Sequence, residues 1–146
     1  MVCTFFGHRE IHNYNEVASK LYDTVYELVE DKGIKHFLVG NNGAFDHMVL
    51  KVLREIAKTH KIHYSVVLSY LNIKKSEYYN LAAEETVYPE FLEKTPKHYA
   101  IDKRNRWMIK ESEIVVTYIN TCIGGAAKYA EICEKRGMEI IKLGKI

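Results

Sequence analysis

The chain has 146 residues, of which 47% are hydrophobic and 27% are charged, and its formal net charge is +2. This composition excludes a disordered chain, and three widely spaced cysteines exclude a disulfide-stapled scaffold. The weak net charge excludes a strongly basic surface for nucleic acids. We therefore expect a single domain over residues 1–146, cytoplasmic and without a membrane-spanning helix.

The first part of the chain alternates short apolar runs with amphipathic segments. Runs at 2–6, 36–39 and 64–68 are apolar without strict alternation, which predicts strands that are buried on both faces. Between them, residues 16–32 and a segment around 48–56 carry apolar side chains at helical spacing. The sequence therefore predicts three strands joined by two helices.

Residues 69–98 interrupt this alternation. They contain both prolines of the chain and several tyrosines, which predicts an inserted loop region with a short helix near 78–85. After it, the sequence predicts a helix that begins with Asp102 as its N-cap and ends near Glu111, followed by a strand at 114–119. A helix at 124–136 and a last strand at 139–143 complete the chain.

This order of elements predicts an α/β fold. Apolar strands that alternate with helices form parallel sheets, and right-handed crossovers give a Rossmann-like doubly wound arrangement. We expect five parallel strands in the order 3-2-1-4-5 with helices on both faces. Such sheets bind ligands at the carboxyl ends of the strands, near the point where the strand order reverses.

Three glycine-containing turns should meet at that edge, because they follow predicted strands 1, 2 and 4. Glycine lets a ligand approach the backbone, and the N-terminus of a following helix favours an anion. Basic residues on the turns and on the helix before strand 4 can add contacts to phosphates. The expected ligand-binding residues are Gly7, His8, Arg9, Gly40, Asn41, Asn42, Gly43, Phe45, Asp46, Arg104, Arg106, Tyr118, Gly124, Gly125, Ala126, Ala127 and Lys128.

Several of these residues have a structural alternative. The turn at 40–43 can cradle a phosphate, or it can be a tight turn in which Asn41 or Asn42 caps the helix. Asp46 can accept a hydrogen bond from a ribose hydroxyl, act as a catalytic acid, or interact with the helix dipole. Glu131 can be a catalytic base or a solvated helix residue. No histidine has zinc-ligand spacing to cysteine or carboxylate residues, so no metal site is expected.

Taken together, these segments resemble the SLOG superfamily, and its YpsA-like members most closely. The resemblance rests on CTFFGHR, LVGNNGAFDHMV, RNRWMI, IVVTYI and GGAAKYAE, and it covers the chain apart from residues 69–98. The GAFD segment is similar to a turn of DprA proteins. Gly124-Gly125 followed by Glu131 resembles the PGGxGTxxE loop of LOG phosphoribohydrolases, with Ile123 in place of the proline and Ala127-Lys128 in place of Gly-Thr.

The resemblance implies a Rossmann-like domain that binds a nucleotide or a molecule derived from NAD or ADP-ribose. Related domains sense such messengers in antiviral signalling, so a sensor or a signal-sequestering sponge is expected, without a cofactor and as a dimer or larger homo-oligomer. An alternative is an enzyme that cleaves a nucleotide N-glycosidic bond, with Glu131 or Asp46 as the catalytic residue. A second alternative is single-stranded nucleic-acid binding, which the weak net charge disfavours.

Overall fold

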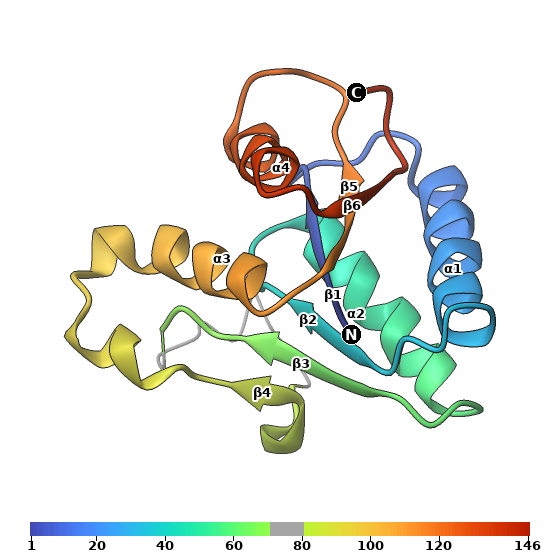
Figure 1. Ribbon diagram of the computed structural model, residues 1–146, viewed down its shortest axis with the longest axis horizontal. Coiled ribbons are helices and arrows are strands. Elements are labelled where there is room, and N and C mark those ends of the chain that lie inside the picture. The colour runs from blue at the N-terminus through green and yellow to red at the C-terminus, as the bar shows by residue number, and fades with distance from the viewer. Residues whose placement is uncertain (71–80) are drawn as a thin grey trace.

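The computed structural model describes residues 1–70 and 81–146, and these form a parallel sheet flanked by helices (Figure 1). The strands of the described residues are β1 (Val2–Gly7), β2 (His36–Val39), β3 (His63–Val67), β4 (Thr86–Val87), β5 (Ile114–Tyr118) and β6 (Glu139–Lys142). Their order is β4-β3-β2-β1-β5-β6, and all neighbours are parallel. The predicted α/β class with a parallel sheet is confirmed.

The prediction of a five-stranded sheet is wrong, because β4 adds a sixth strand at one edge. This strand lies inside the segment 69–98 and pairs with β3 through only two residues. A two-residue strand has no hydrophobic period, and therefore the sequence pattern does not reveal it. The other strands keep the predicted relative order, with the reversal between β1 and β5.

Two pairs of helices cover the two faces of the sheet. The helices are α1 (Tyr14–Glu30), α2 (Ala44–Ala57), α3 (Ala100–Lys110) and α4 (Gly125–Lys135). Phe5 of β1 packs in a core with the apolar sides of α1 and α2, whereas its neighbour Phe6 packs in a second core with α3 and α4. Alternate residues of β1 thus serve opposite cores, as expected for a strand buried on both faces.

The segment before α3 differs from the prediction. Three short 3₁₀ helices, Ala83–Glu85, Glu90–Lys94 and Lys97–Tyr99, follow one another there. The last of them runs directly into α3, so Tyr99 and not Asp102 is the N-cap residue. Of the predicted helix near 78–85, residues 78–80 lie outside the described residues. No helix of the described residues is long and apolar enough to cross a membrane.

An ion pair holds the first 3₁₀ helix of this segment against α2 and β3. Glu85 accepts hydrogen bonds from Arg54 Nε at 2.7 Å and Arg54 Nη2 at 2.9 Å, and from the Tyr64 hydroxyl at 2.7 Å. These bonds, led by those from Arg54, lower the pKa of Glu85 from 4.5 to about 2. The Glu85 side chain is only 12% exposed, so water screens the pair weakly.

Replacing this carboxylate with an amide (Glu85→Gln) should lower the free energy of unfolding at pH 7 by about 2 kcal/mol, because Arg54 loses its charged partner. A carboxylate with a lowered pKa stabilises the fold above its unfolded pKa and loses this effect as the pH falls. The difference between wild type and variant should therefore shrink from about pH 5 toward about pH 2. Urea denaturation over this range measures it.

The matched control is Glu84→Gln, which makes the same charge change at an exposed neighbouring position. Its free energy of unfolding should stay within about 0.5 kcal/mol of wild type. Equal stabilities of the two variants at pH 7 would show that the Glu85 ion pair does not stabilise the fold.

Candidate functional site

A cavity of about 340 Å³ lies at the carboxyl end of β1. It is surrounded by the first turn of α2, by α3 and by the beginning of α4. This is the edge of the sheet and the reversal point at which the sequence predicts a ligand. Its volume falls in the range of small-molecule sites. The cavity is lined by Phe5, Phe6, Gly7, His8, Arg9, Asn42, Asp46, Ile101, Arg104, Asn105, Met108, Gly124, Gly125, Ala126 and Tyr129.

The cavity brings together residues from all three predicted turns and from α3. Of the expected ligand-binding residues, it is lined by Gly7, His8, Arg9, Asn42, Asp46, Arg104, Gly124, Gly125 and Ala126. The remaining expected residues do not line it: Gly40, Asn41, Gly43, Phe45, Arg106, Tyr118, Ala127 and Lys128.

The turn between β2 and α2 is closed by the protein itself. The first N–H groups of α2, those of Ala44 and Phe45, donate to the backbone oxygens of Arg9 and His8 at 2.8 and 3.3 Å. The backbone N–H of Asn42 donates to Asp46 Oδ2 at 2.9 Å. These donors are therefore already satisfied, and the turn does not offer them to a phosphate.

Neither asparagine of this turn caps α2, because the N-cap residue is Gly43 and no side chain bonds to the helix N-terminus. Gly43 has φ +106°, a conformation that favours glycine, and a Cβ here would lie 2.7 Å from the Cα of Arg9. Asn41 and Asn42 instead turn their side-chain oxygens toward Arg104. Both asparagine capping alternatives are thus wrong.

The N-terminus of α4 is open, in contrast to that of α2. Its N-cap residue Gly124 has φ +111° and no side-chain hydrogen bond to the helix. The backbone N–H groups of Gly125, Ala126 and Ala127 find no acceptor among the described residues. A Cβ added at Gly124 would meet no atom within 4 Å. A helix N-terminus with free N–H groups that borders a cavity is suited to an anion.

The other two turns use glycine for packing within the protein. A Cβ at Gly7 would clash with the ring of Phe45, which stacks on Tyr118 with ring centroids 5.9 Å apart. A Cβ at Gly40 would lie 3.0 Å from Asp46 Oδ2 and 3.1 Å from Arg104 Cζ. Gly7 and Gly40 thus allow the cavity wall to form, whereas a Cβ at Gly124 or Gly125 would have no neighbour closer than 4.0 Å.

Arg104 forms the base of the cavity. It is 1% exposed, and its guanidinium donates to Asn41 Oδ1 and Asn42 Oδ1, both at 2.6 Å, and to the Val67 oxygen at 2.9 Å. Its Nε donates to Asn105 Oδ1 at 2.7 Å. Arg104 thus joins α3 to the end of β3 and to the β2–α2 turn, and it leaves a buried positive charge beside the cavity.

Asp46 is the acidic residue of the cavity. Burial raises the pKa of its carboxyl from 3.8 to about 6, against the opposing effects of Arg104, the Asn42 N–H group and Arg9. Near neutral pH, a fraction of Asp46 is therefore protonated. The carboxyl can accept a hydrogen bond when ionised and donate one when protonated.

His8 lines the side of the cavity. Its Nε2 accepts a hydrogen bond from the backbone N–H of Asn120 at 2.8 Å, so the ring proton is on Nδ1. The ring also packs edge-on against Tyr118, which is buried and whose hydroxyl donates to Asn13 Oδ1 at 3.1 Å. These contacts fix the His8 ring at the side of the cavity.

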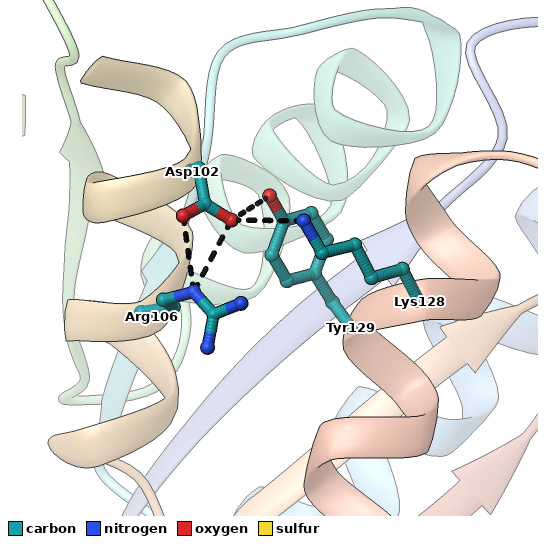
Figure 2. A network of polar contacts seen from close by, with 4 residues as sticks. All are labelled: Asp102, Arg106, Lys128 and Tyr129. Carbon is teal, nitrogen blue, oxygen red and sulfur yellow. Dashed lines mark hydrogen bonds and ion pairs between the residues drawn. The ribbon is translucent and has the colours of Figure 1, made fainter. Parts of the chain in front are cut away.

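Asp102 connects α3 to α4 beside the cavity (Figure 2). Its carboxylate accepts a hydrogen bond from the Tyr129 hydroxyl at 2.7 Å and pairs with Lys128 Nζ at 3.3 Å and Arg106 Nε at 3.0 Å. Although burial raises the pKa of Asp102, these bonds leave it lowered overall. The predicted phosphate contacts Arg106 and Lys128 are therefore paired with Asp102.

Glu131 does not line this cavity. It lies on the other side of α4, at a smaller cavity of about 170 Å³ that Ala127 also lines. Its carboxylate pairs with Lys135 at 3.2 Å and is 64% exposed.

Among the described residues, no three His, Cys, Asp or Glu side chains group as a metal site.

Six lining residues were missed by the sequence prediction: Phe5, Phe6, Ile101, Asn105, Met108 and Tyr129. For α3 a signal exists, since residues 101, 104, 105 and 108 have the spacing of one helical face. No protein-family model matches the chain, and no curated protein matches it significantly.

The close packing at Gly40 predicts that the Gly40→Ala variant loses about 2 kcal/mol of its free energy of unfolding, because the added methyl displaces Arg104 or Asp46. The matched control is Gly125→Ala, where the nearest atom to the new Cβ is 4.0 Å away. It should be as stable as wild type or slightly more stable. Urea denaturation of the three proteins measures this, and a Gly40→Ala variant as stable as wild type would contradict the described packing.

Proposed function

We propose that the cavity binds a nucleotide, or a molecule derived from NAD or ADP-ribose, with a phosphate at the N-terminus of α4. The observation that carries this proposal is the open N-terminus of α4 at the cavity wall, with the free N–H groups of Gly125 and Ala126. Such groups bind phosphate without a charged side chain. The open cavity beside them has room for the rest of a small molecule.

The charges around the cavity favour an anion. Arg9 is exposed at its edge, and the guanidinium of Arg104 lies at its base. The positive end of the α4 dipole has the same sign. Asp46 offsets one of these positive charges, because a carboxyl with a pKa of about 6 is mostly ionised at pH 7, and a net positive charge remains.

The carboxyl of Asp46 suits a sugar hydroxyl, since it lines the cavity and can accept or donate a hydrogen bond. Binding of this kind needs no reaction, and it agrees with the expected role of a sensor or a sponge that sequesters a nucleotide signal. The departures of Ile123 and Ala127-Lys128 from the LOG loop leave the backbone groups for binding in place.

The variant Gly125→Asp tests the phosphate site. A carboxylate on the first residue of α4 would repel an anion, whereas it interacts well with the helix dipole and preserves the fold. Isothermal titration with AMP, ADP-ribose, cyclic ADP-ribose and NAD should give binding of at least one of them to wild type. Gly125→Asp should weaken that binding by about tenfold or more.

The matched control is Asn15→Asp, which adds a carboxylate in the first turn of α1, at an exposed position outside the cavity lining. Its affinity should equal that of wild type within about twofold. If folded wild-type protein binds none of the four compounds, or if both variants bind equally well, the proposal fails.

The raised pKa of Asp46 supports a second candidate function, the cleavage of a nucleotide N-glycosidic bond. A general acid works best when its pKa lies near the working pH, and a carboxyl at about 6 in a cavity meets this need. Glu131, the other expected catalytic residue, does not line the cavity. Asp46 is therefore the residue on which this function depends.

For this second function, incubation with AMP or NAD should release the free base, which chromatography measures. The rate should fall as the pH rises above about 6, because the acid loses its proton. Asp46→Asn should abolish the release, and Glu131→Gln should leave it unchanged. Release that persists in folded Asp46→Asn would exclude Asp46 as the acid.

A further inference from the structure

The wall of the cavity formed by α3 carries the apolar side chains of Ile101 and Met108 together with the polar ones of Arg104 and Asn105. Ile101, Asn105 and Met108 have the spacing of one helical face, and all three line the cavity. Phe6 of β1 and Tyr129 of α4 line it too, with their rings stacked at a centroid distance of 5.4 Å. This part of the cavity is therefore suited to a flat apolar group.

Asn105 is a polar residue beside these apolar side chains, and a hydrogen bond from Arg104 fixes the orientation of its amide. Its oxygen accepts the 2.7 Å hydrogen bond from Arg104 Nε, so the amide nitrogen must point the other way. The Asn105 side chain also interacts with the Tyr129 hydroxyl, and this interaction lowers the pKa of Tyr129 against the larger effect of burial, which raises it. Tyr129 in turn donates its proton to Asp102.

An amide nitrogen carries two N–H groups, and the single Tyr129 hydroxyl oxygen can satisfy at most one of those of Asn105. The residue is only 8% exposed, so water reaches the second N–H poorly. A buried donor without an acceptor is costly, and a ligand that supplies the acceptor recovers this cost. The cavity thus offers one fixed donor beside an apolar surface.

We propose that Ile101, Asn105, Met108, Phe6 and Tyr129 form a compartment for a nucleobase, in which Asn105 donates to a ring nitrogen or carbonyl oxygen of the base. This inference rests on the proposed function, because it takes the phosphate to lie at the N-terminus of α4. It adds that affinity comes from the base as well as from the phosphate, and that Asn105 determines specificity.

The test compares ligands with and without a base. Isothermal titration measures the affinity of the full chain for AMP, GMP, CMP and UMP. Each affinity is compared with that for ribose 5-phosphate, which has the same sugar phosphate and no base. At least one nucleotide should bind wild type about tenfold more tightly than ribose 5-phosphate. This affinity ratio is the readout, because a general change in electrostatics affects both ligands and cancels.

Two variants then test Asn105. Asn105→Asp keeps an oxygen for Arg104 Nε but replaces the donor by an acceptor, and Asn105→Ala removes both groups. Each should lower the affinity ratio by about tenfold, while affinity for ribose 5-phosphate changes less. Asn15→Asp, the exposed α1 variant, should keep the wild-type ratio. Thermal denaturation selects the variants that are folded.

The outcomes separate the two proposals. If wild type binds neither the nucleotides nor ribose 5-phosphate, the base compartment is wrong, and the proposed function fails with it when ADP-ribose, cyclic ADP-ribose and NAD do not bind either. If wild type binds all of them equally, the phosphate site stands and the base compartment is wrong. If wild type prefers a nucleotide and both folded Asn105 variants keep that ratio, the specificity role of Asn105 is overturned.

Discussion

The hydrogen bonding of one buried cation, Arg104, organises the candidate site. A guanidinium removed from water is costly unless its donors are satisfied, and here the acceptors come from three parts of the chain. They are the Val67 oxygen at the end of β3, the side chains of Asn41 and Asn42 in the β2–α2 turn, and Asn105 on α3 itself. The planar guanidinium of Arg104 therefore fixes the relative positions of these acceptor groups beside the cavity.

Two similar turns at the cavity differ in the backbone donors that they leave free. Gly43 and Gly124 are both N-caps with nearly the same backbone angles, φ +106° and +111°. Around Gly43 the β1–α1 loop and Asp46 use the available donors, whereas around Gly124 no described residue does so. The same local conformation is thus closed by hydrogen bonds within the protein at Gly43, whereas at Gly124 the N–H groups of the following helix stay available.

The sequence predicts the sheet edge at which the cavity lies, but it does not predict all the side chains that line this cavity. Apolar runs and glycine turns are local signals, so the principal strands, the helices and the meeting of the three turns could be predicted. The direction of a helical side chain depends on how the helix is rotated against the sheet. For α4, this rotation directs Tyr129 to the large cavity and Glu131 to the other side, and no local pattern specifies it.

The edges of the sheet affect how the chain behaves beside other chains. An exposed strand edge can pair with a strand of another molecule and so begin aggregation. Here β4 offers only two residues, and β6 begins with Glu139 and ends with Lys142, both exposed. Short edges that carry charge are poor templates for pairing, so this fully parallel sheet is protected against growth by strand addition.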